Sequence, residues 1–341
     1  MPTLSVVIVT HHSAPAIERT VGALVAELRD GDELIVVDNE SFDETVACVR
    51  ELAPDATVIE TGANLGFSAA CNRGAGAAKG ELLCFLNPDA VPQPGWREAI
   101  AAPAASGEWA AWQALVTAEG GKVINTAGGV VHFTGIAWAG QAGQPVDAAA
   151  AGEPGFVSGA CLAIRRDTFE VAGGFPEEFF LYHEDVDLSL RLRLAGGRLG
   201  VAADAVVDHD YEFEKGPEKW RYLERNRWAT LIRTYPAALL FVLGPGLLAT
   251  ELALIPISIA GGWFGQKVRA GLDLVRWLPR LLRERREIGA RRTASAREFA
   301  EALQPELDSP YLGGAGRSGL LRGLLAGYWR LALGLLPRGR G

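Results

Sequence analysis

Three acidic residues of this chain stand where a carboxylate could do chemistry. Asp38 ends an apolar run, Asp89 follows another apolar run, and Asp185 opens a stretch with helical spacing. A carboxylate at a strand end can accept hydrogen bonds from a base or a ribose. One carboxylate plus substrate phosphates is also a common way of holding Mg²⁺ or Mn²⁺. The residue types therefore suit a site for a nucleotide and a divalent metal.

Structural roles stay open for all three residues. Asp38, in VVDNESFDET, could cap a helix or form an Asx turn. Asp89, in FLNPDAV, could be an ordinary turn residue whose backbone Pro88 restricts. Asp185, beside Glu184, could act only as a helix cap, because the positive end of a helix dipole favours acidic residues.

The elements that must position these residues follow a β-α-β-α pattern. Near-continuous apolar strands separated by helix-patterned segments predict an α/β fold, with a parallel sheet covered on both faces. Ligands of such sheets bind beyond the carboxyl ends of the strands. The predicted strands are Leu4–Thr10, Leu34–Asp38, Val58–Thr61 and Leu82–Leu86, and the predicted helices are Ala16–Arg29, Asp43–Ala53 and Ser68–Lys79.

The next part of the chain is less regular. Residues 101–155 are rich in Ala and Gly, and we expect strands only at Ala110–Thr117 and Gly129–Gly135. An apolar strand is predicted at Val157–Arg165. A helix is predicted to begin near Glu184 and to end at the pair Gly196 and Gly197.

Several classes of protein fit poorly. The Gly-rich stretch GANLGFSAACNRGAG lacks the G-x-G-x-x-G spacing of a Rossmann dehydrogenase, and no P-loop or G-x-S-x-G motif is present. A nucleotidyltransferase would need a basic, Gly-rich loop where THHSAPAIE stands. The four scattered cysteines predict free thiols in a reducing compartment. The first residues, MPTLSVVIVT, predict a strand and not a signal peptide.

Five segments, in order, resemble glycosyltransferase family 2, in particular its bacterial rhamnosyltransferase-like branch. They span about residues 4–209 and read SVVIVTHHSA, IVVDNESFDET, ANLGFSAACNRGAGAAKGELLCFLNPDA, SGACLAIRRDTFEVAGGFPEEFFLYHEDVDLSLRLRLAGG and VVDH. The resemblance implies the GT-A fold, a mostly parallel sheet flanked by helices. It also implies an inverting enzyme that moves a sugar from a nucleotide diphosphate to an acceptor hydroxyl.

The resemblance assigns roles to the nucleotide-side residues. Asp38 would contact the nucleoside, with Thr10, His12 and Asn64 nearby. Asn87 stands where many relatives have the first Asp of a DxD-like motif, and we place it with the donor-binding residues.

The resemblance also assigns the metal and the base. Asp89 would be the ligand of Mg²⁺ or Mn²⁺, and His209, in VVDH, would complete the metal site as it does in some relatives. An imidazole ligand favours Mn²⁺. Asp185 would be the general base, and we expect the like charge of Glu184 and Asp187 to raise its pKa.

Charge divides the chain into two expected domains. Residues 1–215 carry a formal charge of −18 and would form the catalytic domain, whereas residues 216–341 carry +10 and would form a helical, basic region. Because apolar residues lie between the basic ones, this region favours a membrane surface over nucleic acid. A buried helical subdomain or an oligomer interface is the alternative.

The segment Pro236–Gly265 contains one charged residue, Glu251, and is interrupted by Pro245 and Pro256. Its uninterrupted runs are shorter than the roughly 20 residues of a straight span. Basic residues flank both ends, which predicts that both lie on the cytoplasmic side. We therefore expect a re-entrant hairpin or two helices in the membrane interface. WLPRLLRERREIGARR and LLRGLLAGYWRLALGLLPRG are amphipathic and basic, which suits anionic headgroups.

These features together predict a peripheral or monotopic protein on the cytoplasmic face of a bacterial inner membrane. The branch favours dTDP-rhamnose as donor, with UDP-sugars open, and a lipid-linked or polysaccharide acceptor. The competing hypothesis is a catalytically silent sugar-nucleotide-binding subunit of a polysaccharide assembly complex. The sequence leaves oligomerisation open.

Overall fold

The structure, a computed structural model, describes residues 1–150, 152–209, 216–307 and 318–337. Contacts divide the chain into two compact units. The first comprises residues 1–129, 139–189 and 197–212, and the second comprises residues 130–138, 190–196 and 213–341. Two short pieces that precede residue 216 thus group with the C-terminal region.

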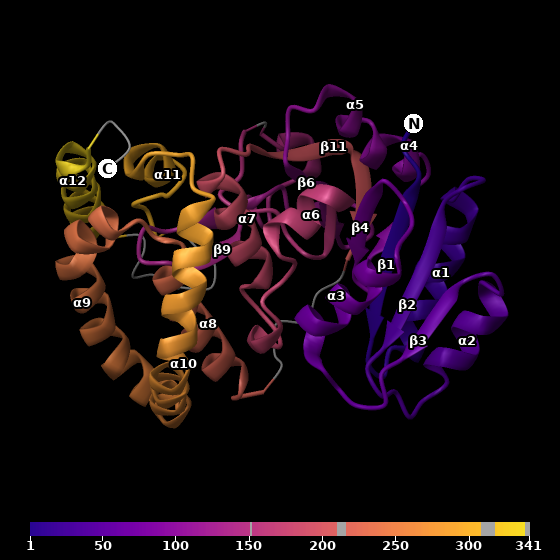
Figure 1. The fold of residues 1–341 in the computed structure, drawn as a ribbon, viewed down its shortest axis with the longest axis horizontal. Helices are drawn as coiled ribbons and strands as arrows, with labels where there is room; N and C mark the ends of the chain where they lie inside the picture. Colours follow the sequence, from indigo (N-terminus) through magenta and orange to yellow (C-terminus); the bar gives the residue numbers. More distant parts are fainter. Residues whose placement is uncertain (151, 210–215, 308–317, 338–341) are drawn as a thin grey trace. The chain divides into compact units, whose positions relative to one another are not determined.

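A nine-stranded mixed sheet forms the centre of the first unit (Figure 1). Its order is β3-β2-β1-β4-β10-β6-β11-β5, with β7 paired to β6. β3, β2, β1 and β4 are parallel, whereas β10 runs antiparallel to both of its neighbours. The strands are β1 (Leu4–Thr10), β2 (Glu33–Asp38), β3 (Thr57–Glu60), β4 (Leu82–Leu86), β5 (Val91–Pro92), β6 (Ala111–Ala118), β7 (Val123–Thr126), β10 (Cys161–Arg165) and β11 (Leu199–Asp208). The predicted α/β class is confirmed, and the four predicted N-terminal strands are present.

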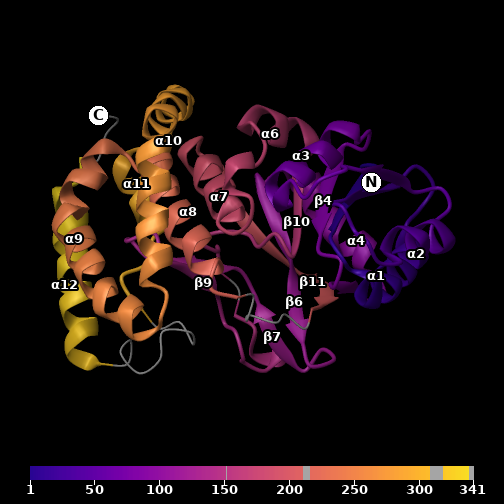
Figure 2. The ribbon, with the colours of Figure 1, turned by 90° about the horizontal axis from the view of Figure 1, so that it is seen from below.

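Helices cover both faces of this sheet, as the near-continuous apolar strands predicted. Figure 2 shows α3 and α6 on one face and α1 and α4 on the other. The helices of this part are α1 (Ala14–Glu27), α2 (Thr45–Leu52), α3 (Gly66–Ala77), α4 (Trp96–Ala101), α5 (Pro103–Ser106), α6 (Arg166–Ala172) and α7 (Glu184–Leu194). α3 lies so close to the sheet that a Cβ on Gly74 would stand 2.3 Å from a methyl group of Val7.

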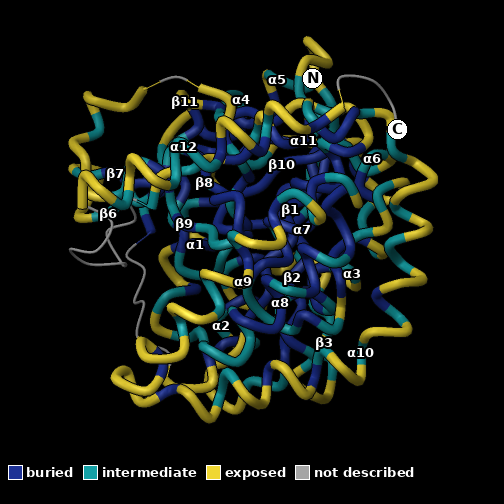
Figure 3. Tube along the Cα trace, turned by 90° about the vertical axis from the view of Figure 1, so that its left-hand side faces the viewer, coloured by how far each residue is buried: buried dark blue, intermediate teal, exposed yellow. Residues whose placement is uncertain are grey.

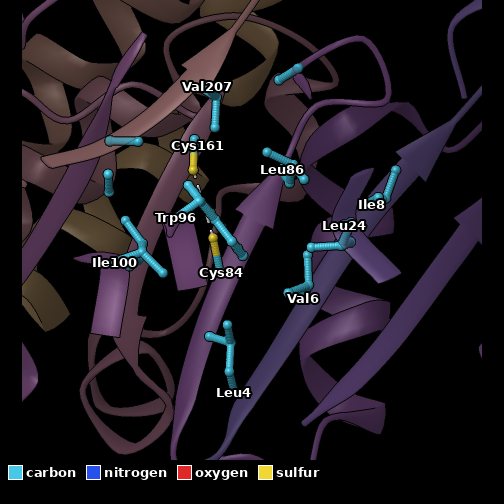
Figure 4. Packing of buried hydrophobic residues seen from close by; sticks show 14 of the residues in the cluster. Leu4, Val6, Ile8, Leu24, Cys84, Leu86, Trp96, Ile100, Cys161 and Val207 are labelled. Carbon is cyan, nitrogen blue, oxygen red and sulfur yellow. Dashed lines mark hydrogen bonds between the residues drawn. The ribbon is translucent and has the colours of Figure 1, made fainter. Parts of the chain in front are cut away.

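Alternate residues of the strands point to opposite faces. Leu4, Val6 and Ile8 of β1 join the core on the α1 and α4 side (Figure 4). β1, β2 and β10 are almost entirely buried (Figure 3). All four cysteines are free thiols, and the sulfurs of Cys84 and Cys161 lie 3.9 Å apart in this core.

Two predicted strands are shorter than expected. The predicted strand Gly129–Gly135 is present only as β8 (Gly129–Val131), which pairs with β9 (Ala137–Ala139). β10 begins at Cys161 and not at Val157, because the residues before it form a loop whose amides bond to side chains.

The second unit is helical and contains α8 (Lys219–Thr234), α9 (Ala237–Ala260), α10 (Phe264–Ala290), α11 (Ala296–Glu301) and α12 (Gly319–Leu335). α9 corrects the prediction of a hairpin or helix pair, because it continues through Pro245 and Pro256. By length and composition, α9 could cross a membrane, and its most apolar 18-residue window has a mean hydropathy of 2.0.

Candidate active site

Asp38 lies at the carboxyl end of β2, beside the end of β1. Its side chain is buried, with 2% of the residue exposed. Thr10 Oγ1 donates to Asp38 Oδ1 at 2.8 Å, and the amide of Ser41 donates to Oδ2 at 2.9 Å. The structure therefore brings Asp38 and Thr10 together, as the resemblance implies, and holds the carboxylate rigidly at the edge of the sheet.

His12 lies in the turn that follows β1. Its backbone has a positive φ of 52°, and its amide donates to Ser41 Oγ at 2.9 Å. The amide of Phe42 donates to His12 Nδ1 at 3.3 Å, and the two rings lie 5.6 Å apart. Phe42, which was not a predicted site residue, is 82% exposed. Its one signal was an aromatic residue within the polar segment NESFDET.

Asn39 connects the end of β2 to the start of α3, and Asn64 lies in the loop that precedes α3. Asn64 Oδ1 accepts from the amide of Gly66 at 3.0 Å. Asn39 is buried, its Nδ2 donates to the Gly66 carbonyl at 3.1 Å, and its Oδ1 accepts from the amide of Leu65 at 3.3 Å. Asn39 was not among the predicted site residues. It positions the loop that carries Asn64.

Asp89 and His209 meet although they lie 120 positions apart in the sequence. His209 Nε2 is 3.0 Å from Asp89 Oδ1. The cause is the pairing of β5 with the end of β11, which aligns Val91 with Asp208 and so brings the residues just beyond each strand together. The Asp89 side chain is 40% exposed and that of His209 only 4%, so the pair opens to solvent through the carboxylate.

This pair fits a divalent cation in its donor chemistry. It supplies one carboxylate oxygen and one imidazole nitrogen, and metals bound with substrate phosphates take their remaining ligands from phosphate and water. Among the described residues no group of three or more His, Cys, Asp or Glu side chains could hold a metal. A cation here would therefore depend on the substrate for most of its ligands.

Asp185 lies in the first turn of α7, as predicted. Its Oδ2 accepts from the amide of Gly159 at 3.1 Å, and its Oδ1 accepts from the amide of Val186 at 2.8 Å. The neighbouring carbonyl of Ala160 accepts from the amide of Asn87 at 3.0 Å. Residues 159 and 160 thus connect Asp185 to the segment that carries Asn87 and Asp89.

Side chains hold the loop formed by residues 157–160. The amide of Val157 donates to Ser189 Oγ at 3.1 Å, and the amide of Ser158 donates to Gln113 Oε1 at 2.8 Å. Gln113 is fully buried on β6 and was not predicted as a site residue. Because these amides bond to side chains and not to a strand, the loop stays out of the sheet and presents Gly159 to Asp185.

Burial raises the pKa of Asp185 to about 6, although the hydrogen bonds from Gly159 and Val186 act in the opposite direction. The leading cause is therefore burial, and not the like charge of Glu184 from which we predicted a raised pKa. Burial, followed by the charge of Asp185, raises the pKa of Glu184 well above its usual range. Asp185 is therefore suited to accept a proton near neutral pH.

The segment before Asp185 has an unusual backbone. Phe180, Tyr182 and His183 have φ values of 63°, 69° and 68°. Non-glycine residues with such values are uncommon and concentrate at functional sites. The carbonyl of Phe180 accepts from the amide of Phe67 at 2.6 Å, which fixes this segment to the start of α3.

The chain is similar in sequence to several known proteins. Residues 5–172 match the model of the family described as Glycosyl transferase family 2. The N-acetylglucosaminyl-diphospho-decaprenol L-rhamnosyltransferase of Mycobacterium tuberculosis is 30% identical over 257 residues, which cover 67% of this chain and 83% of that protein. The O-antigen biosynthesis protein RfbC of Myxococcus xanthus is 31% identical over 222 residues, or 60% of this chain and 17% of that protein.

Solved structures support the GT-A fold. GalNAc-T7 with UDP, GalNAc and Mn²⁺ aligns with a TM-score of 0.58 at 18% identity, over 70% of this chain and about half of that protein, 49%. Residues 1–349 of S. aureus TarS in complex with UDP align with a TM-score of 0.51 at 16% identity, over 97% of this chain and 90% of that protein. At these identities the likeness concerns the fold.

Proposed function

The chain belongs to glycosyltransferase family 2, and on this premise we propose that it is an inverting, metal-assisted transferase that moves a sugar from a nucleotide diphosphate to an acceptor hydroxyl. The observation that carries the proposal is the connection of Asp185 to the Asp89 segment through Gly159 and Ala160. It brings a carboxylate that can accept a proton to the sheet edge where the Asp89–His209 pair lies.

In the proposed reaction the acceptor oxygen attacks the anomeric carbon while Asp185 takes the hydroxyl proton. The bond from the anomeric carbon to the diphosphate oxygen breaks, and the nucleotide diphosphate leaves from the opposite face, so that the configuration inverts. The pKa of about 6 leaves Asp185 mainly ionised at neutral pH. Its two amide donors keep the carboxylate oriented before the acceptor arrives.

Asp89 and His209 would hold the metal. A bound Mn²⁺ or Mg²⁺ would supply positive charge that offsets the charge of the departing diphosphate. Asp38, Thr10, His12, Asn64 and Asn87 are the proposed donor-binding residues.

The names of the relatives direct the choice of substrates. Because a mycobacterial relative at 30% identity is named an L-rhamnosyltransferase of a diphospho-decaprenol carrier, we take dTDP-rhamnose as the first donor and a lipid-linked sugar as the first acceptor. UDP-sugars and growing polysaccharides come next. The cytoplasmic face of a bacterial inner membrane would supply such acceptors, and the basic C-terminal region would keep the enzyme there.

A donor panel tests the proposal. Purified full-length protein with Mn²⁺ is incubated with dTDP-rhamnose, UDP-glucose or UDP-N-acetylglucosamine, and the release of nucleoside diphosphate is followed with and without a lipid-linked acceptor. We expect acceptor-dependent release with one donor. Donor binding without any transfer or hydrolysis would instead favour the silent scaffold subunit.

A further inference from the structure

Glu251, the one charged residue of α9, bonds to two other helices. Its carboxylate accepts from Arg227 and from Trp228 Nε1 of α8, the latter at 3.0 Å. Lys267 Nζ of α10 lies 2.6 Å from its second oxygen. Arg227 is 2% exposed and also pairs with Glu224 at 3.2 Å. Glu251 therefore belongs to a charged network that connects three helices of the second unit.

The position of Glu251 makes it unfavourable for α9 to cross a membrane. The helix has 24 residues, and about 36 Å of helix would cross a bilayer with Glu251 near the middle. The network would then bring Arg227, Lys267 and Glu224 towards the hydrocarbon centre. Charged side chains are strongly disfavoured at that depth.

α12 provides a second attachment, at Pro245. In a regular helix the amide of Gly246 would donate to the carbonyl of Val242. Here the hydroxyl of Tyr328 stands between them, because it accepts from Gly246 at 3.2 Å and donates to Val242 at 2.8 Å. A Cβ on Gly246 would lie 2.7 Å from the Tyr328 ring. α9 thus continues through its proline with help from another helix, which a lone span would lack.

The other sides of these helices expose large apolar residues at intervals of three, four or seven positions. Such spacing places them on one face of each helix. On this face α9 exposes Phe241, Leu248, Leu252, Ile255 and Ile259, whereas its exposed Ile257 points to another side; α10 exposes Phe264, Val268, Leu272, Val275, Leu278 and Leu282; α12 exposes Leu320, Leu324, Leu331 and Leu335. We call these three rows the apolar stripes.

Positive charge accompanies the stripe of α10. Arg269, Arg283 and Arg286 are exposed, and within the parts of the chain that the structure describes they form no ion pair. A second copy of this face would carry the same excess of positive charge, which the exposed Glu287 of α10 offsets only in part. Anionic lipid headgroups instead complement these charges, while the acyl chains complement the apolar stripes.

We propose that α9 lies along the surface of an anionic membrane and does not cross it, with the apolar stripes dipping into the lipid and the arginines of α10 on the headgroups. Both ends of α9 then remain on the cytoplasmic side. The inference rests on the proposed membrane-associated function and specifies its geometry. Glu251 faces away from the lipid, towards Arg227 and Lys267.

Labelling the two ends of α9 tests this geometry. Single cysteines, Ala237→Cys and Ala260→Cys, are placed in a full-length Cys48→Ser background, because the other native cysteines are buried. A membrane-impermeant maleimide is then applied to intact bacterial cells and to sealed inverted vesicles. We expect both positions to react in inverted vesicles and neither in intact cells. Any other pattern, above all Ala260→Cys reacting only from outside, overturns the proposal.

Vesicle flotation tests the lipid contacts. Purified protein is mixed with phosphatidylglycerol-containing vesicles or with pure phosphatidylcholine vesicles. Since each arginine near an anionic surface contributes a factor of roughly five, R269Q/R283Q/R286Q should bind the anionic vesicles about a hundredfold more weakly. V268Q/L272Q/V275Q should lose binding to both kinds of vesicle. The control is V25Q/V171Q, which replaces exposed valines outside the stripes and should bind as wild type.

Different results would contradict the membrane-docking proposal and the proposed catalytic function. If the triple variants bind anionic vesicles as wild type does, the docking proposal is wrong, whatever the transfer assay shows. If vesicle binding and labelling agree with the proposal but no donor is turned over, the proposed catalysis fails and the membrane geometry stands.

Discussion

The amide of Gly159 donates to Asp185 Oδ2 at 3.1 Å, across 26 positions of sequence. This bond joins the loop that precedes β10 to the first turn of α7. Because β10 lies beside β4, it brings Asp185 to the sheet edge that carries Asp89.

Asp185→Asn should remove the proposed base while keeping the shape of the side chain. We expect kcat to fall by roughly 10²- to 10⁴-fold, the usual contribution of a positioned base. Donor affinity, measured by calorimetry with nucleoside diphosphate and Mn²⁺, should change little. Asp204→Asn makes the same chemical change at an exposed position of β11 and should retain normal turnover. Near-normal turnover of Asp185→Asn would exclude Asp185 as the base.

The pH dependence should report the raised pKa of Asp185. Only the ionised carboxylate can accept the acceptor proton, and the ionised fraction grows as pH rises through about 6. We therefore expect kcat/KM to fall by about tenfold for each pH unit below that value and to level off above it. The residual rate of Asp185→Asn should lack this limb. A limb near pH 4 in the wild-type enzyme would contradict the role of burial.

The Asp89–His209 pair should control the metal requirement. Asp89→Ala should lower turnover by roughly a hundredfold or more, because charge compensation at the leaving group is worth several kcal/mol. His209→Gln should weaken Mn²⁺ more than Mg²⁺, since imidazole suits Mn²⁺ better. The measurement is a metal titration of turnover with each ion. Full activity of the wild-type protein after exhaustive chelation would show that no metal acts there.

Gly66 and Gly76 form a matched pair within α3. Gly66 has a φ of 80°, and a Cβ there would lie 2.5 Å from the carbonyl oxygen and the ring of Phe180. Gly66→Ala should therefore destabilise the fold by about 1–3 kcal/mol. Gly76 has nothing within 4 Å of its added Cβ, so Gly76→Ala should leave stability unchanged or raise it by up to about 1 kcal/mol. Thermal unfolding compares the two, and equal melting temperatures would show that the Phe180 segment yields without cost.

Periodicity predicted the N-terminal half of the sheet well. β1 and β4 have the predicted bounds, because their apolar runs are long and end at turn residues. The same reasoning placed the start of β10 at Val157, four residues before its actual start at Cys161. An apolar sequence could not reveal that the amides of residues 157–159 bond to Ser189, Gln113 and Asp185, which are distant in sequence.

The candidate site was predicted in part. The order of the motifs selected Asp38, Asp89, Asp185 and His209, and the structure brings Asp89 to His209 and Thr10 to Asp38. Asn39 and Gln113 were not predicted as site residues, because they bind backbone groups that only the folded chain brings near them. In the C-terminal region, prolines suggested a break in α9. The hydroxyl of Tyr328 satisfies the backbone next to one of these prolines instead.

The decisive measurement is a structure of the full-length protein with Mn²⁺ and a non-hydrolysable analogue of its donor. We expect the metal to lie between Asp89, His209 and the diphosphate, with the carboxylate of Asp185 facing the anomeric carbon on the side opposite the leaving group. A donor bound away from the carboxyl ends of β1, β2 and β4, or an Asp185 on the same side as the diphosphate, would contradict it.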